Sequence, residues 1–213
     1  MDFLTGVFDL LVHLDRHLLA LARDYGGWIY LLLFLIIFCE TGLVITPFLP
    51  GDSLLFVAGT LAGAGAMDAH VLVAVLTVAA VIGNSVNYAV GRWLGARVFR
   101  SQDSWLFKKA YLERTHRYFE RFGGRTIIIT RFVPIVRTYA PLVAGIGAMN
   151  YPRFLLFNVV GALLWVGLLV YAGYLFGNVP LVKNNLTLVI FAIILVSTSP
   201  AIIELVRHRL KRA

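Results

Sequence analysis

Charged residues are scarce in this sequence of 213 residues. They make up 14% of the chain, whereas hydrophobic residues make up 60% and the mean hydropathy is +0.83. Soluble domains carry about 25% charged residues, and a soluble chain of this length could not bury so much apolar surface in one core. The scarcity excludes an ordinary soluble enzyme and a disordered chain. It indicates one integral membrane domain over residues 1–213.

Cysteine and acidic residues are also few. Cys39 is the only cysteine, so the chain cannot form an intrachain disulfide. The 11 acidic residues stand against 19 basic ones, which gives a net charge of +8. No basic stretch forms a soluble module of its own. We therefore attribute the excess to the positive-inside rule and expect no nucleic-acid partner.

Motifs of enzymes and of metal sites are missing from the sequence. There is no Gly-x-Ser-x-Gly elbow, and the apolar segments contain no His-x-x-x-His pair or acidic cluster with metal spacing. His13 and His17 lie four positions apart, but two ligands without a third are a weak signal. We therefore predict a protein that is not an enzyme and has no metal or cofactor.

The apolar runs predict an all-α integral membrane protein with about four full transmembrane helices and two re-entrant hairpins. The full spans are expected at about 27–45, 71–90, 154–176 and 186–206. Proline and glycine interrupt two further apolar segments, at 46–66 and 126–148. Such broken segments are tolerated at membrane depth only where protein or water covers them, which favours re-entrant hairpins.

Three polar segments set the expected orientation. We predict an amphipathic surface helix at 1–26, a basic amphipathic segment at 96–125 and a basic tail at 207–213. Basic residues stay on the cytoplasmic side, and two full spans separate the basic segment from the tail. We therefore expect both termini to be cytoplasmic.

An internal similarity predicts an inverted repeat of segments 27–95 and 126–177. A shift of 82 positions superimposes the following groups: Ala62–Met67 on Ala144–Met149, Gly91 on Gly173, and Gly95 on Gly177. Small residues recur by chance in membrane helices, but five identities in the first six positions exceed what composition suggests. Inverted repeats with opposed hairpins hold the substrate sites of transporters near the membrane midplane.

Four charged side chains lie inside these hydrophobic segments: Glu40, Asp52, Arg131 and Arg137. A charge at bilayer depth costs about 2.5–3.5 kcal/mol, so each needs a partner, a cavity or a function. One interpretation is that the acids and arginines only pair to hold the two hairpins together. The other is that they form a substrate site, in which arginines bind phosphate or carboxylate and the acids exchange protons.

Further polar and helix-breaking residues are predicted to line the same cavity. They are Asn84, Asn87, Tyr88, Asn158, Pro47, Pro50, Gly51 and Pro134. The first three share one face of the second span. Interhelical hydrogen bonding is the plainer interpretation of the asparagines and the tyrosine, and it is the one that we favour.

Two motifs resemble the DedA family, a branch of the SNARE-associated Golgi protein or VTT-domain superfamily. One is ETGLVITPFLPGDSLLF from Glu40 to Phe56, and the other is TRFVPIVRTYAP from Thr130 to Pro141. The resemblance covers nearly the whole chain. It implies a multi-span inner-membrane protein with two opposed re-entrant loops, linked to lipid translocation and to recycling of undecaprenyl phosphate. The essential acids and arginines of the family match the four charges named above, but Asn84 stands where close relatives often carry aspartate.

Three hypotheses follow. The leading one is a flippase or scramblase for a phosphate-bearing lipid, in which Arg131 and Arg137 bind the phosphate. Glu40 and Asp52 release it on changing protonation, so the expected partners are an anionic membrane lipid and protons, with an oligomer left open. The second is a proton-coupled antiporter for small cations or drugs. The third is a membrane organiser, in which the four charges could be replaced together without loss.

Overall fold

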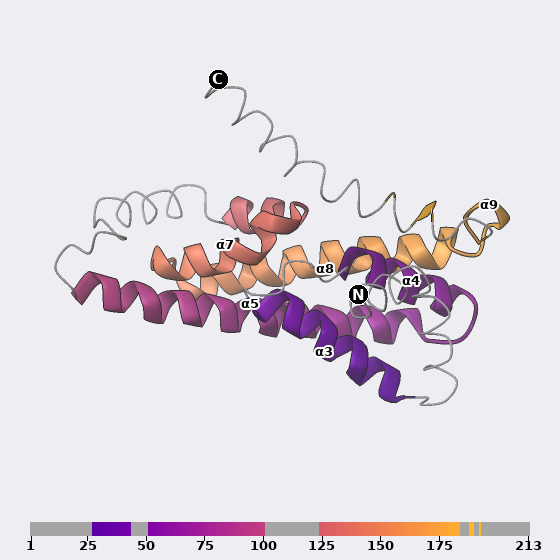
Figure 1. The fold of residues 1–213 in the computed structure, drawn as a ribbon, viewed down its shortest axis with the longest axis horizontal. Helices are drawn as coiled ribbons and strands as arrows, with labels where there is room; N and C mark the ends of the chain where they lie inside the picture. Colours follow the sequence, from indigo (N-terminus) through magenta and orange to yellow (C-terminus); the bar gives the residue numbers. More distant parts are fainter. Residues whose placement is uncertain (1–26, 44–50, 101–123, 184–187, 190–191, 193–213) are drawn as a thin grey trace, which may run out of the picture. The chain divides into compact units, whose positions relative to one another are not determined.

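A computed structural model describes residues 27–43, 51–100, 124–183, 188–189 and 192. These residues form helices and turns, with no strand among them. The helices in Figure 1 are α3 (Trp28–Gly42), α4 (Gly51–Gly63), α5 (Ala69–Arg100), α7 (Pro134–Ile146), α8 (Tyr151–Phe176) and α9 (Pro180–Lys183). Residues 124–130 are helical as well. Several expected segments lie outside the described residues: the surface helix at 1–26, residues 101–123 of the basic segment, nearly all of the span at 186–206 and the tail at 207–213.

Two of the described helices are long and apolar enough to cross a membrane. They comprise Ala69–Gly95 within α5 and Tyr151–Phe176, which is α8. The first expected span, 27–45, appears as the shorter α3. The all-helical expectation is confirmed for the described residues, whereas the full number of spans and the re-entrant character of the hairpins stay predictions.

Helix α5 is longer than the sequence predicts. The span is expected to end near residue 90 and a separate surface segment to begin at 96, but α5 continues to Arg100. No proline interrupts residues 91–100, and leucine and arginine favour the helical conformation. The change from apolar to basic residues near position 92 therefore does not end the helix.

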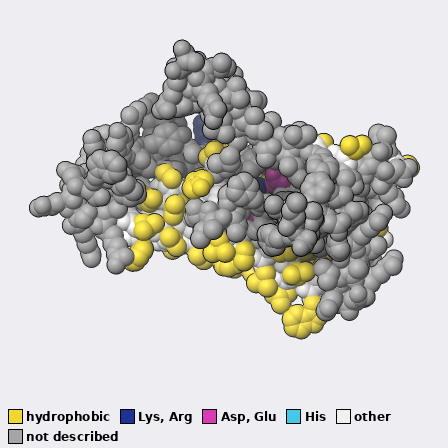
Figure 2. All heavy atoms as spheres, in the orientation of Figure 1, with side chains coloured by type: hydrophobic (Ala, Val, Ile, Leu, Met, Phe, Trp, Pro, Cys, Tyr) yellow, Lys and Arg dark blue, Asp and Glu magenta, His cyan; other side chains and the backbone are white. Residues whose placement is uncertain are grey.

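The exposed face of α5 is apolar, and its buried face carries polar side chains. Asn84 and Asn87 are buried. The exposed side chains recur every three or four residues: Val78, Ile82, Val86, Val90 and Trp93. Figure 2 shows hydrophobic side chains gathered on the described surface. A helix of a soluble protein has the opposite arrangement, so α5 is suited to lipid on its outer face and to polar partners on its inner face.

Asp68 caps the beginning of α5. Its Oδ1 accepts hydrogen bonds from the backbone N–H groups of Val71 at 2.9 Å and His70 at 2.8 Å. The bond from Val71 is the main cause that lowers the pKa of Asp68 below its ordinary 3.8, and the bond and charge of His70 add to it. An acidic N-cap satisfies backbone donors that the first helical turn leaves without partners.

The lowered pKa makes the start of α5 sensitive to acid. A carboxylate with a lower pKa in the folded state stabilises that state above the unfolded pKa and loses the effect as pH falls through the folded pKa. We expect amide exchange at His70 and Val71, corrected for intrinsic rates, to accelerate below pH 3.8 in the wild type. Asp68→Ala should show this acceleration at neutral pH, whereas Asp68→Asn should not. Wild-type protection in Asp68→Ala would contradict the capping role.

The chain divides into two compact units that draw on the same long helices. Unit 1 contains described residues 27–36, 51–76, 166–183, 188–189 and 192. Unit 2 contains described residues 37–43, 77–100 and 124–165. Each unit therefore combines one short helix, α4 or α7, with part of α5 and part of α8.

Unit 2 packs α7 closely against α5. Gly91 of α5 lies against the Leu142 carbonyl of α7, and Gly145 of α7 lies against the Tyr88 carbonyl of α5. A Cβ atom at either glycine would overlap the opposing carbonyl oxygen. Small residues let two backbones approach, which is how helices in membranes commonly pack.

Unit 1 packs α4 against the end of α8 in a similar way. Gly173 of α8 lies against the Phe56 carbonyl of α4, and Gly59 of α4 lies against the Val170 carbonyl of α8. Eleven residues of α4 are buried, which suits a short helix that is enclosed by protein. Glycines on both helices thus replace the larger side chains that would separate them.

The two units share a packing pattern that only partly follows the expected shift of 82 positions. The contacting glycines of the long helices, Gly91 and Gly173, are 82 positions apart. Those of the short helices, Gly59 and Gly145, are 86 positions apart. The short helix is therefore displaced by about one helical turn relative to the sequence alignment. The inverted repeat stays a prediction.

Candidate functional site

A helix–turn–helix in unit 2 positions both arginines of the second motif. Helical residues 124–130 end in a turn at 131–133, where the N–H of Arg131 bonds to the carbonyl of Ile128 at 3.2 Å. Helix α7 then starts at Pro134. Proline suits the first turn of a helix, because it has no backbone N–H and that turn offers no intrahelical acceptor for one. The sequence thus places Arg131 in the turn and Arg137 in the first turn of α7.

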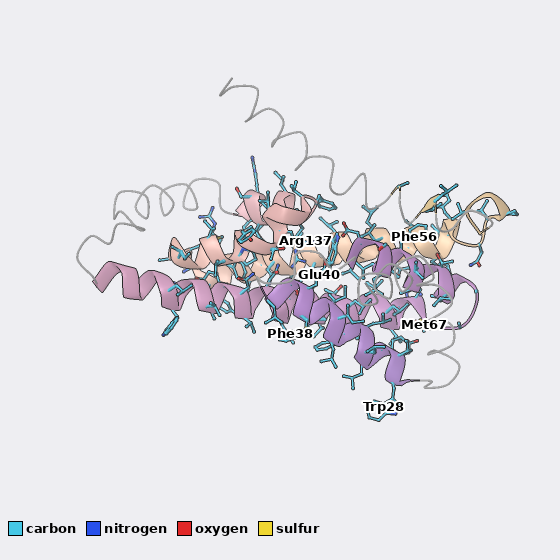
Figure 3. All side chains as sticks on the ribbon, in the orientation of Figure 1. Trp28, Phe38, Glu40, Phe56, Met67 and Arg137 are labelled. Atoms are coloured by element: carbon cyan, nitrogen blue, oxygen red, sulfur yellow. The ribbon has the colours of Figure 1, made fainter. Side chains whose placement is uncertain are left out.

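Arg137 forms a buried ion pair with Glu40 of α3. Arg137 Nη2 donates to Glu40 Oε1 at 2.9 Å, and both side chains are under a tenth exposed. Figure 3 shows the two labelled side chains directed toward one another. The guanidinium also lies over the ring of Trp165, 4.5 Å from its centroid. The sequence alone does not show which acid pairs with Arg137. The ion pair with Glu40 and the cation–π contact with Trp165 together stabilise the buried guanidinium.

Arg131 is buried without a carboxylate partner among the described residues. It is 1% exposed, and its Nη2 donates to the side-chain oxygen and, at 3.3 Å, to the backbone oxygen of Asn158. Nε and Nη1 have no hydrogen-bond partner within the described part of the chain. A Cβ at Gly161 would lie 3.0 Å from Arg131 Cδ, so this glycine makes room for the side chain. Arg131 therefore presents unused donors in a low-dielectric surrounding.

The predicted polar residues of α5 and α8 form interhelical hydrogen bonds. Asn84 Nδ2 donates to Asn158 Oδ1 at 3.0 Å. Asn87 Nδ2 donates to the Thr138 carbonyl of α7 at 2.7 Å. The Tyr88 hydroxyl donates to the Met149 carbonyl. These residues connect α5 to α7 and α8 around the two arginines, which is the plainer role that the sequence analysis favoured.

The remaining predicted site residues form none of these contacts. Asp52 and Gly51 are in the first turn of α4, in unit 1, where a carboxylate interacts favourably with the helix N-terminus. Pro134 begins α7. Pro47 and Pro50 lie outside the described residues. Unit 2 thus brings together three of the four intramembrane charges, and Asp52 belongs to the other unit.

Three contributors to the site were not predicted from the sequence. Trp165 lies in the apolar span at 154–176, where nothing in the pattern distinguishes an aromatic side chain from a core residue. Thr138 and Thr41 contribute backbone carbonyls to Asn87, at 2.7 and 3.4 Å. Their position next to Arg137 and Glu40 is the only signal that could have found them.

The charged groups of this site are two guanidinium groups and one carboxylate, Arg131, Arg137 and Glu40. Within the described ranges, no group of three or more His, Cys, Asp or Glu residues could hold a metal ion. Guanidinium groups bind phosphate and carboxylate with charge-assisted hydrogen bonds, which are stronger than bonds between neutral groups. Arg131 offers donors to such an anion, while Arg137 is engaged by Glu40.

Comparison with known proteins assigns the family. The model of the VTT domain matches residues 49–175. Protein DedA of Escherichia coli K12 is 53% identical over 211 residues, covering 98% of this chain and 96% of that protein. The inner membrane protein YqjA of the same organism is 40% identical over 182 residues, covering 84% and 81%. An uncharacterized membrane protein of Mycobacterium leprae is 46% identical over 168 residues, covering 79% and 75%.

No solved structure matches the chain. The family resemblance of the two motifs is confirmed by the domain match and by identity along nearly the full length. Two apolar helices of spanning length agree with the membrane location in the names of the relatives. The chain belongs to the DedA family of VTT-domain membrane proteins.

Proposed function

We propose that this protein transports a phosphate-bearing lipid, such as undecaprenyl phosphate or a phospholipid, across the bacterial inner membrane. The observation that carries the proposal is Arg131, a buried guanidinium with two nitrogen atoms that lack partners among the described residues. Unpaired buried charges are costly, so an anionic ligand would remove a penalty as well as add hydrogen bonds. A lipid phosphate would neutralise the charge of Arg131 and accept hydrogen bonds from its Nε and Nη1.

The other charges have distinct roles in this proposal. Glu40 holds Arg137 in an ion pair at 2.9 Å, and Trp165 supports the same guanidinium. A phosphate that reaches Arg137 competes with Glu40, and protonation of Glu40 would favour the phosphate. Asp52 of the first motif is the second acid in the proposal, and a change in its protonation would also promote release of the lipid. Both termini are cytoplasmic in this scheme, and protons are the second partner.

Replacing Arg131 tests the phosphate site directly. We expect Arg131→Ala to weaken binding of undecaprenyl phosphate by about tenfold or more, because a charge-assisted contact of 1.4 kcal/mol or greater is lost. Native mass spectrometry of the purified protein measures the binding. Undecaprenol, which lacks the phosphate, is the neutral control lipid. Arg125→Ala, which removes an exposed arginine from the same hairpin, is the matched control variant.

Two results would count against the proposal. Equal binding of undecaprenyl phosphate and undecaprenol to the wild type would show that the protein does not recognise the phosphate group. Equal losses in Arg131→Ala and Arg125→Ala would reduce Arg131 to a contribution to overall charge.

A proton-coupled antiporter is the second candidate. The observation that favours it is the burial of Glu40, because an acidic side chain inside an apolar segment is costly and commonly marks a path for cations or protons. Proton flux that depends on a cationic substrate in vesicles, together with no preference for the anionic lipid, would select the antiporter.

A further inference from the structure

Asn158 is the centre of the hydrogen bonds around Arg131. Its side-chain oxygen accepts from Arg131 Nη2 and from Asn84 Nδ2. Its Nδ2 donates to the Val81 carbonyl at 3.1 Å, and the side chain is fully buried. A guanidinium can only donate, so the atom that faces it has to be the amide oxygen, and the other bonds agree with that orientation. The amide group of Asn158 is therefore fixed from three sides.

This arrangement holds Arg131 by one nitrogen and leaves the others available. Nη2 is bonded twice, to the side-chain and backbone oxygens of Asn158. Nε and Nη1 have no partner in the described ranges. A guanidinium held in this way is oriented before any ligand arrives, which reduces the entropy lost on binding.

Asn158 also occupies the place where a counter-ion to Arg131 would be effective. A carboxylate has nearly the same shape as the amide and would form a buried ion pair there. Asn158 bonds to Arg131 and to Asn84, and both asparagine side chains are neutral amides. The neighbouring charge that acts on Arg131 is the like charge of Arg137. The positive charge of Arg131 therefore has no compensation among the described residues.

We propose that Asn158 is a positioning residue that sets the charge selectivity of the site. It orients Arg131 without neutralising it, so that the ligand has to supply the negative charge. This inference rests on the proposed function, in which Arg131 binds the lipid phosphate. Its consequence is specific, because exchanging the amide for a carboxylate closes the site to anions while the shape of the side chain is preserved.

The test is Asn158→Asp, with undecaprenyl phosphate and undecaprenol as probes in native mass spectrometry. We expect this variant to lose about tenfold or more of the affinity for undecaprenyl phosphate, as Arg131→Ala does, and to bind undecaprenol as the wild type does. The melting temperature of the variant checks that it folds, because the new ion pair with Arg131 is offset by loss of the hydrogen bond that Asn158 Nδ2 donates to the Val81 carbonyl. Asn150→Asp makes the same change at an exposed position and should leave both affinities unchanged.

A second variant separates orientation from charge and does not depend on the stability of Asn158→Asp. Asn158→Ser is too short to hold Arg131 Nη2 but adds no charge. We expect it to weaken the binding of undecaprenyl phosphate while preserving the preference over undecaprenol. Wild-type affinity in Asn158→Ser would overturn the positioning role.

The outcomes also distinguish the inference from the proposed function. If the wild type prefers the phosphate lipid and Arg131→Ala does not, wild-type behaviour of Asn158→Asp overturns the inference alone. If the wild type shows no preference, the proposed function fails and the inference fails with it. Loss of anion preference in Asn158→Asp, with a stable fold and a silent Asn150→Asp control, supports both.

Discussion

Replacing Glu40 alone with leucine is expected to destabilise the protein by about 3–5 kcal/mol, the cost of breaking a buried ion pair on one side. The substitution removes the carboxylate that lies 2.9 Å from Arg137 Nη2, while the guanidinium stays buried. Thermal unfolding in detergent, followed by intrinsic fluorescence, measures the loss. Arg125→Leu, which removes an exposed charge, should change the melting temperature little.

The double variant Glu40→Leu/Arg137→Met decides what the pair is for. Replacing both partners of a buried ion pair with apolar side chains is often neutral or stabilising, so we expect it to recover most of the lost stability. The coupling between the two sites then appears as strong non-additivity in a double-mutant cycle. A stable double variant that has lost phosphate-lipid binding places the pair in function. A stable double variant with full binding and transport assigns the pair to structure, the role in which it only holds the segments of the chain together.

Gly91→Ala is expected to destabilise the protein by about 1–3 kcal/mol or more, which is typical of overpacking at a close contact. Its Cβ would overlap the Leu142 carbonyl oxygen, and backbone cannot move aside as a flexible side chain can. Gly167→Ala is the matched control, since nothing lies within 4 Å of its Cβ. There the higher helix propensity of alanine should add up to about 1 kcal/mol.

The same thermal measurement checks this pair of glycine variants. Opposite shifts of the melting temperature are the expected result. A melting temperature of Gly91→Ala at or above that of Gly167→Ala would show that the approach of α5 and α7 does not depend on the absence of a side chain. Gly173→Ala, at the corresponding contact of unit 1, should behave as Gly91→Ala does.

Composition and motifs by themselves determined the class of this protein. The apolar runs predicted helices where α3, α5 and α8 occur, because hydrophobic length along one chain is a local property. The wording of the two motifs was sufficient for the family, which the domain match confirms. Glu40, Arg131 and Arg137 stood out for the same reason, since a charge inside an apolar segment is visible without any knowledge of its neighbours.

The tertiary structure alone decided which of these residues meet. Arg137 pairs with Glu40 across 97 positions of the chain, and Arg131 is held by the neutral Asn158. Trp165 joins the site although its position in an apolar span gives no sign of this in the sequence. Helix α5 continues past its apolar stretch, and no proline interrupts it between residues 91 and 100. Such pairings depend on the approach of helices that are far apart in the chain. Here glycines allow that approach, and the carbonyl groups that they contact cannot be identified from the sequence pattern.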